Sequence, residues 1–203
     1  RCYHTSANSS MDDSILQKLR RETRSQHETL ERKVDIEERL NAPASYRRLL
    51  GVLWGLYGGL EEKILTRASE LRMWLPDLDV RMRSQRLAED LRVLGAQPVL
   101  SFPMPDLAPL AAVPEQFGCL YVLEGSTLGG QVLYRTIRNR LGYSREYGAS
   151  FFAAHGEQTG PMWKRFCDAL EDYARQNPAV HDRIVSAACS TFAVFDDWTA
   201  AHL

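Results

Sequence analysis

The chain has 203 residues, of which 44% are hydrophobic and 25% are charged, values that suit a single globular domain with a substantial core. Its formal net charge of -1 gives no overall attraction to polyanions, so we expect neither nucleic acid nor an anionic membrane as a partner. No apolar run is long enough to span a bilayer, and the N-terminus has no apolar signal segment, so we expect a cytoplasmic protein.

The N-terminal residues 1–12 are polar and show no periodic pattern. We expect them to be disordered or derived from cloning, ahead of one domain over residues 13–203. Four cysteines lie far apart and form no C-x-x-C pair, which disfavours zinc ribbons, thioredoxin-like redox sites and covalent haem attachment. They are Cys2, Cys119, Cys167 and Cys189. We expect reduced, structural thiols.

Two amphipathic helices are predicted in the first third of the domain. Apolar residues recur at three- and four-residue spacings over residues 14–34, with Asp12, Asp13 or Ser14 available as the N-cap. The same period continues over residues 46–71, and Pro43 is well placed for the first turn of that helix.

The rest of the chain also follows a helical pattern. The predicted segments are, in order, a polar helix over 81–95 ended by Gly95, a proline-bearing link over 96–114, a long helix over 114–141, a loop with a short helical piece over 142–160, and helices over 161–176 and 177–203. No segment alternates as a strand does. We therefore predict an all-α, single-domain bundle of six or seven helices.

Three glycines interrupt the predicted helix over 114–141: Gly125, Gly129 and Gly130. Each costs a helix interior about 1 kcal/mol relative to alanine, so a purely structural helix would avoid them. Glycines allow a flat ligand to approach the helix backbone and allow the helix to bend. Close packing of a second helix against small residues is the alternative explanation. Both explanations place something large against this helix.

A histidine, His27, lies on the apolar face of the first predicted helix. A lone histidine there is more often a hydrogen-bonded core residue than a metal ligand. Glu31 follows one turn later, where its carboxylate can orient the imidazole in the way that metal-binding histidines need. Both interpretations remain open on this evidence.

Arg20 and Arg24 flank His27 on the same side of the helix. They can meet two carboxylates of a ligand centred on the imidazole. They can equally be a solvated run of arginines balanced by Glu22 and Glu28, which is commoner on amphipathic helices.

Several enzyme classes lack their motifs in this chain. The E-x-x-H pattern of di-iron bundles is absent, and so is the G-K-[ST] ending of a phosphate-binding loop. Ser126 does not stand in a G-x-S-x-G nucleophile elbow. His155 and His181 fall in a predicted loop and at a predicted helix start, where we expect capping or solvent contact.

Four segments together carry a resemblance to a known family: "RRETRSQHETLE", "LWGLYGGLEEKI", "LEGSTLGGQVL" and "NPAVHDRIVSAACSTF". In this order and spacing they resemble the haem oxygenases over about residues 14–198. Among bacterial members, the stretch "LYVLEGSTLGGQ" is most similar to the bacteriophytochrome-associated enzymes. The resemblance implies an α-helical fold that holds haem b between a proximal and a kinked distal helix. It also implies O2-dependent cleavage of haem to biliverdin, CO and ferrous iron, with electrons from a ferredoxin or a reductase, and a possible bacteriophytochrome recipient.

The same resemblance implies roles for individual residues. His27 matches the axial ligand of the haem iron, and Gly125, Gly129 and Gly130 match the distal glycines. Tyr57 matches a tyrosine of the distal hydrogen-bond network. The remaining matches are Arg20, Arg24 and Lys164 near the haem propionates and Phe192 packed near the haem.

Two positions depart from the family pattern. Ser126 replaces the distal aspartate of many haem oxygenases, which implies that a water network passes through Tyr57 and Ser126 without a carboxylate. Asp168 replaces a second propionate-side arginine, which weakens the clamp that decides which meso carbon is attacked. The biliverdin isomer is therefore not assigned by the sequence. A haem carrier or sensor without turnover is the alternative function, and a thiaminase-like relative of the fold is a third.

Overall fold

The computed structural model describes residues 14–96 and 110–203. The expected disordered segment 1–12, Cys2 and most of the predicted link 96–114 lie outside these described residues. The described chain contains helices and turns but no strand, as predicted. The longer helices are α1 (Ile15–Val34), α3 (Pro43–Thr66), α6 (Ser84–Val93), α7 (Val113–Leu141), α9 (Thr159–Gln176) and α10 (His181–His202). The short ones are α2 (Ile36–Arg39), α4 (Leu71–Trp74), α5 (Leu78–Arg81), α8 (Ser150–Ala153), η1 (Gly156–Gln158) and η2 (Pro178–Val180).

Helix α1 starts where its sequence offers a capping box. Of the three possible caps, Ser14 is the one used: its hydroxyl accepts a hydrogen bond from the backbone N–H of Gln17 at 3.3 Å. The Gln17 side chain in turn accepts from the backbone N–H of Ser14 at 3.0 Å. This reciprocal pair satisfies two backbone donors that no helical carbonyl can reach.

The second predicted helix begins at Pro43 as expected but ends five residues early, at Thr66. Its last carbonyls are satisfied by a different helix. The buried side chain of Gln116, from α7, donates to the carbonyl oxygens of Ile64 and Arg67 at 3.3 and 3.1 Å. This contact replaces continued helical hydrogen bonding, so the chain turns there and forms the separate short helix α4.

Helix α6 begins three residues later than its sequence pattern suggests. The buried carboxylate of Glu61, on α3, accepts from the backbone N–H groups of Arg83 at 2.7 Å and Ser84 at 2.9 Å. A carboxylate at this point caps the helix and interacts favourably with its positive end. A residue from another helix therefore decides where α6 starts.

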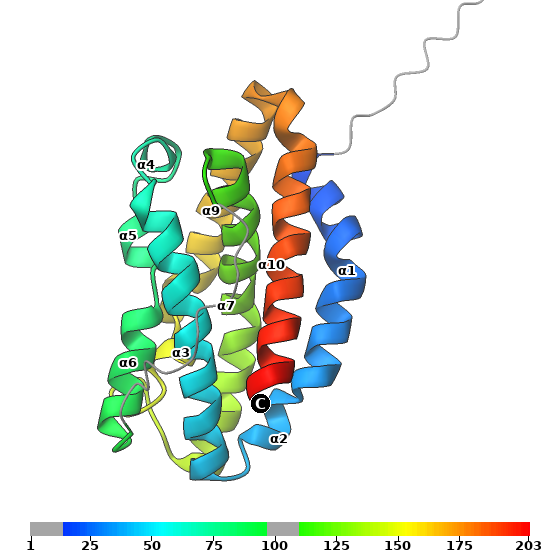
Figure 1. Ribbon diagram of the computed structural model, residues 1–203. Helices are drawn as coiled ribbons and strands as arrows, with labels where there is room; N and C mark the ends of the chain where they lie inside the picture. Colours follow the sequence, from blue (N-terminus) through cyan, green and yellow to red (C-terminus); the bar gives the residue numbers. More distant parts are fainter. Residues whose placement is uncertain (1–13, 97–109) are drawn as a thin grey trace, which may run out of the picture.

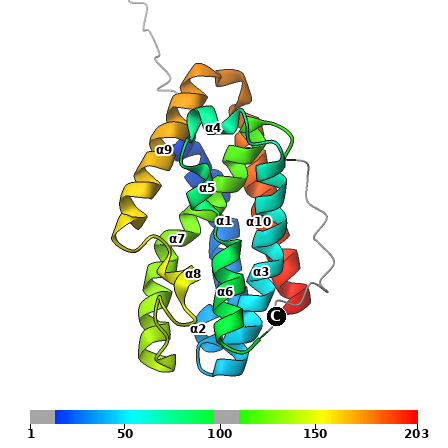
Figure 2. The ribbon, with the colours of Figure 1, turned by 90° about the vertical axis from the view of Figure 1, so that its left-hand side faces the viewer.

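Helix α10 packs mainly against α7 and α1 and also contacts α3 (Figure 1). Figure 2 shows that α6 and α8 lie against the lower half of the bundle, whereas α4 and α5 cover its upper end. Helix α7 remains one helix through its glycines, although its ribbon changes direction along its length in Figure 2. None of the helices in the described ranges is long and apolar enough to cross a membrane.

The close approach of α7 and α10 depends on Gly118. A Cβ atom at this position would lie 2.3 Å from the carbonyl oxygen of Ile184 and 2.7 Å from the Cβ of Ala187. Both distances are far below a van der Waals contact, so only glycine fits here. Helix α7 therefore does pack closely against another helix through a glycine. That glycine is Gly118, which precedes Gly125, Gly129 and Gly130 in the chain.

Candidate functional site

A cavity of about 510 Å³ opens between α1 and α7, within the usual range of small-molecule sites. Aromatic and aliphatic side chains dominate its walls, with a few polar groups among them. Because α1 and α7 both pack on α10, the space left between them is closed from behind by α10 side chains such as Phe192 and Phe195.

The α1 wall contains four of the residues predicted from sequence: Arg20, Arg24, His27 and Glu31. The His27 side chain is 56% exposed, so it is not a satisfied core histidine. Its Nε2 atom lies 3.6 Å from a carboxylate oxygen of Glu31, too far for a direct hydrogen bond. The ring also meets Phe192 edge-on, with centroids 5.9 Å apart. The His27 ring therefore contacts Phe192 along one edge, and the rest of the ring is accessible from the cavity.

The two arginines of α1 differ in their partners. Arg24 forms an exposed ion pair with Glu28, with Nε and the carboxylate oxygen 2.9 Å apart. This is the charge balance that a solvated helix face would show. Arg20 is exposed as well, and within the described chain it has no ion pair. Both line the cavity, so both remain able to meet ligand carboxylates at its rim.

The α7 wall is built from the three glycines, which line the cavity together. A Cβ atom added to Gly129 would meet nothing within 4 Å, and one added to Gly125 would only touch the ring of Trp163 at 3.8 Å. Gly130 lies against the carbonyl oxygen of Phe152, which a Cβ atom would approach to 3.4 Å. In contrast to Gly118, none of the three would force a Cβ atom into a clash with the described residues, since the nearest approach is the 3.4 Å of Gly130 to α8. The glycines leave room for a bulky flat ligand against the backbone.

Tyr57 and Ser126, predicted to share a distal network, are hydrogen-bonded with their oxygens 2.8 Å apart. Ser126 donates its own proton to the carbonyl oxygen of Leu123 at 2.6 Å, so Tyr57 is the donor in the shared bond. Burial raises the pKa of Tyr57, and its phenol therefore stays protonated. The two residues are thus in direct contact at the cavity wall, and their role in a distal water network stays a prediction.

One member of this network was missed by sequence reasoning. Arg83 lines the cavity, is only 3% exposed, and donates from Nη2 to Leu123 at 2.7 Å and to Ser126 at 3.0 Å. No pattern in the sequence marks this arginine, because a run of arginines at a helix start usually faces solvent. Trp163 and Phe151 are further cavity residues that the sequence did not single out.

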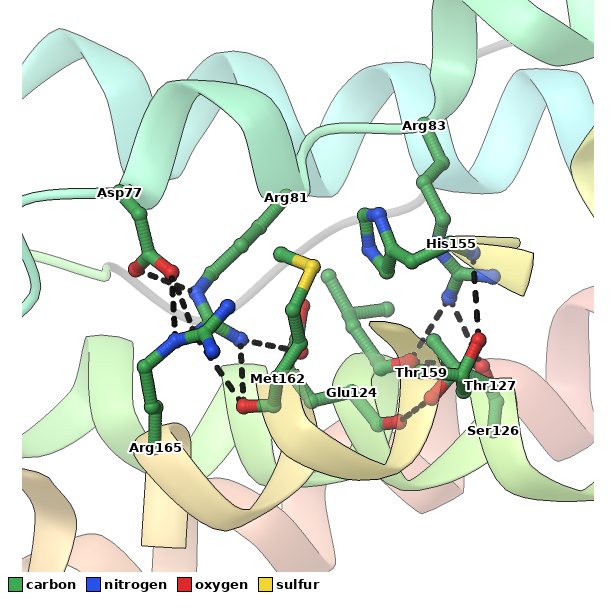
Figure 3. Close-up of polar contacts among 11 residues, drawn as sticks. Asp77, Arg81, Arg83, Glu124, Ser126, Thr127, His155, Thr159, Met162 and Arg165 are labelled. Atoms are coloured by element: carbon green, nitrogen blue, oxygen red, sulfur yellow. Dashed lines mark hydrogen bonds and ion pairs between the residues drawn. The ribbon is translucent and has the colours of Figure 1, made fainter. Parts of the chain in front are cut away.

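A second buried arginine, Arg81, ties three helices together beside the cavity (Figure 3). It is 1% exposed and forms ion pairs with Glu124 on α7 at 2.6 Å and with Asp77 at 2.7 Å. It also donates to the carbonyl oxygen of Met162 on α9 at 3.2 Å. A buried guanidinium is tolerated when carboxylates and hydrogen bonds compensate it. This cluster fixes α5, α7 and α9 relative to one another.

His155 does not have the purely capping or solvent role expected from its loop position. Its Nε2 atom is buried and has no hydrogen-bond partner in the described structure. Burial, together with nearby arginines of which Arg86 is the foremost, lowers the pKa of this histidine to about 4. The ring is neutral at physiological pH. His181 starts α10 as predicted, and its ring contacts the carbonyl oxygen of Ala174.

Lys164 is the one predicted ligand-binding residue that does not line the cavity. It forms an exposed ion pair with Asp168, one turn along α9, at 2.6 Å. The lysine expected near the propionates and the aspartate that replaces an arginine of the family pattern are thus paired with each other. The cysteines of the described chain, Cys119, Cys167 and Cys189, are free, as expected.

Comparison with known proteins decides which family this arrangement belongs to. The family model described as "Heme oxygenase" matches residues 13–101 and 104–201. The chain belongs to the haem oxygenase family. A heme oxygenase of Xanthomonas campestris pv. campestris (strain 8004) is 35% identical over 166 residues, which cover 78% of this chain and 90% of that protein.

The fold agrees with that family. The NO- and CO-bound heme oxygenase of Neisseria meningitidis superposes with a TM-score of 0.81 at 22% identity, covering 93% of this chain and 92% of that one. The heme oxygenase of Leptospira interrogans gives 0.70 at 18% identity, covering 93% and 99%. The single all-α domain predicted from sequence is confirmed.

A haem oxygenase is a haem-degrading enzyme, so haem is the substrate of this chain. The cavity fits a haem in its size, in its aromatic lining and in the glycines that open its α7 wall. A histidine and two arginines stand on the α1 wall, where metal-binding and carboxylate-binding groups would be needed.

Proposed function

We propose that the protein cleaves haem to biliverdin, with release of CO and ferrous iron, and that His27 is the axial ligand of the haem iron. One observation carries the proposal: His27 and the glycines of α7, far apart in the sequence, line the same cavity from different helices. A neutral imidazole beside a carboxylate such as that of Glu31 is a common ligand arrangement.

Bound haem supplies the iron that activates O2 and the ring that is opened. The chain's own residues bind and orient it. Gly125 and Gly129 allow the ring to approach the α7 backbone, and Phe192 packs behind His27. Arg20 and Arg24 bind the propionates at the rim of the cavity. Lys164 joins them only if it leaves Asp168, an exposed pair that contributes little stability.

On the α7 side, the hydroxyls of Tyr57 and Ser126 are bonded to each other, and an ordered water at the inner wall of the cavity accepts from Arg83 and donates to the Tyr57 oxygen. The carboxylates that line the cavity in the described structure are Glu28 and Glu31, both on α1. No carboxylate therefore stands at Ser126 to accept or supply a proton, and hydroxyl groups take that place. This difference supports a proton path through water rather than through an acidic side chain.

We further propose a cytoplasmic enzyme of the bacteriophytochrome-associated subgroup. A ferredoxin or a reductase supplies its electrons, and a bacteriophytochrome receives the biliverdin. The support is the match of the stretch "LYVLEGSTLGGQ" to that subgroup. The recipient is tested by expressing the protein together with a bacteriophytochrome, and each of them alone, and by measuring whether biliverdin purifies with the bacteriophytochrome.

The axial ligand is tested with His27→Ala. We expect ferric haem to bind at least about tenfold more weakly. Mutating even a residue that only supports a metal ligand typically lowers metal affinity by that factor. The Soret band of any complex formed should also shift. His181→Ala is the matched control, because His181 starts α10 away from the cavity lining. An unchanged affinity and spectrum for His27→Ala refutes the assignment.

Turnover is tested by an absorption time course of the haem-loaded protein in air with ascorbate, an iron chelator and catalase. We expect the Soret band to decay while a red bilin absorption grows, and chromatography of the same sample identifies the isomer. A Soret band that persists although the iron has been reduced contradicts the proposal and favours a haem carrier. Failure to take up haem favours another ligand for the cavity.

A further inference from the structure

Two arginines two residues apart are both almost fully buried, but only one of them forms ion pairs in the described structure. Arg81 is paired with Glu124 and Asp77. Arg83, at 3% exposure, has only neutral contacts for its guanidinium in the described structure. These are the carbonyl oxygen of Leu123, the hydroxyls of Ser126 and Tyr57, and the rings of Phe151 and Tyr57.

The charge of Arg83 cannot be lost by deprotonation, because a guanidinium keeps its proton in proteins. Its ring contacts are close, with the central carbon 4.7 Å from the centroid of Phe151 and 5.2 Å from that of Tyr57. Cation-π contacts compensate part of the lost hydration, but less than a carboxylate would. A buried cation without a direct ion pair favours any anion that comes within reach.

The hydrogen bonds show which donors remain free. The two hydrogens of Nη2 serve Leu123 and Ser126, while Nε and Nη1 have no acceptor within the described chain. Ser126 has no proton left, since its own goes to Leu123 and its oxygen accepts from Tyr57 and Arg83. Of this group, Arg83 alone can donate further hydrogen bonds toward the cavity that it lines.

The arginine is also fixed in place before any ligand arrives. Glu61 holds its backbone N–H at 2.7 Å, and Nη2 is clamped to the α7 backbone through Leu123. Figure 3 shows Arg83 reaching from the start of α6 toward Ser126 on α7. A preorganised charge of this kind stabilises a developing negative charge without further rearrangement.

We propose that Arg83 makes the inner wall of the haem cavity a binding site for a small anion, and for an oxygen ligand that gains negative charge. The Nε and Nη1 groups are the donors. Ser126 and Tyr57 position the guanidinium rather than contact the anion. The inference rests on the proposed function in one respect, namely that haem occupies this cavity.

The test is the affinity of the ferric, haem-loaded full chain for fluoride, followed by absorption at a fixed neutral pH. Arg83→Met should weaken fluoride binding about tenfold or more, the usual effect of removing a hydrogen bond to a charged group. Carbon monoxide, a neutral ligand of the ferrous protein, should bind with an affinity changed by less than about threefold, because it carries no charge to stabilise.

Two further variants sharpen the result. Ser126→Asp keeps Arg83 but places a carboxylate at a position whose present oxygen is 3.0 Å from Nη2, so it should weaken fluoride binding as Arg83→Met does. If Arg83→Met does not fold, the fluoride affinity of Ser126→Asp tests whether the charge of Arg83 binds the anion. Arg86→Met is the matched control: Arg86 follows on α6, is partly buried and does not line the cavity. It should leave fluoride affinity unchanged.

Three outcomes would overturn the inference. The first is an unchanged fluoride affinity in Arg83→Met and Ser126→Asp. The second is an equal loss of affinity in Arg86→Met, which would show that a general charge effect is responsible. An equal loss of fluoride and carbon monoxide binding would indicate a distorted cavity instead. If the wild-type chain takes up no haem, the proposed function itself fails, and that result is visible in the Soret band before fluoride is added.

Discussion

The glycines of α7 give the sharpest prediction, because the structure assigns opposite roles to two of them. Gly118 is required by packing, whereas Gly129 has open space beside it, which the proposed ligand would occupy. Alanine at Gly118 would place its Cβ 2.3 Å from the carbonyl oxygen of Ile184. Alanine at Gly129 would place it in open space, with nothing within 4 Å. The same substitution should therefore change the stability of the haem-free protein in opposite directions.

The magnitudes follow from two effects. Alanine stabilises a helix interior by about 1 kcal/mol relative to glycine at either site. Overpacking costs about 1–3 kcal/mol, and the contact of Gly118 with a backbone oxygen places it at the upper end. We expect Gly118→Ala to lose about 2 kcal/mol, or about 4–8 °C in Tm, and Gly129→Ala to gain about 1 kcal/mol, or about 2–4 °C.

Haem binding should show the reverse order for Gly129. Its new methyl group occupies space that the ligand needs, and an overpacking cost of about 1–3 kcal/mol weakens haem binding about 5- to 150-fold. The assays are urea unfolding of the haem-free protein and a haem titration followed at the Soret band. The reasoning is refuted if Gly129→Ala lowers the stability of the haem-free protein, or if it binds haem as tightly as the wild type.

Three other predictions concern the surroundings of the cavity. Arg81→Met leaves the carboxylate of Glu124 buried without its cation, so urea unfolding should show a loss of about 3–5 kcal/mol; a loss below about 1 kcal/mol would contradict the role of this pair. Lys164→Ala removes only the exposed pair with Asp168 and should change the free energy of unfolding by less than about 0.5 kcal/mol, which makes it the surface control. The pKa of His155 is lowered to about 4, against about 6.5 in the unfolded chain, so the unfolded state binds more protons and stability falls as the pH drops between these values. His155→Gln should flatten this pH dependence, and an unchanged slope from pH 7 to 4.5 would show that the histidine is not responsible.

Helix positions were largely predictable, whereas helix ends were not. The three- and four-residue spacing of apolar residues predicted α1, α3, α7, α9 and α10 because a buried helix face needs that period. The end of α3 and the start of α6 were misplaced. Their backbone groups are satisfied by Gln116 and Glu61, which come from other helices. Local patterns contain no information about such partners.

The candidate site divides in the same way. His27 and the glycines of α7 were marked in the sequence, since a histidine on an apolar face and three glycines in a helix both depart from local rules. The sequence did not decide whether the glycines serve a ligand or a helix, and it did not mark Arg83 at all. Those points depend on which atoms lie within a few ångströms of each residue.

The amino-acid sequence by itself determined the all-α class, the approximate helices and the residues most unlike their surroundings. Only the tertiary structure decided that Gly118 packs against α10 while Gly129 faces the cavity, and that Arg81 forms ion pairs while Arg83 forms hydrogen bonds to neutral groups. The physical reason is that secondary structure follows from periodic local preferences. Burial, charge compensation and free volume instead depend on contacts between segments far apart in the chain.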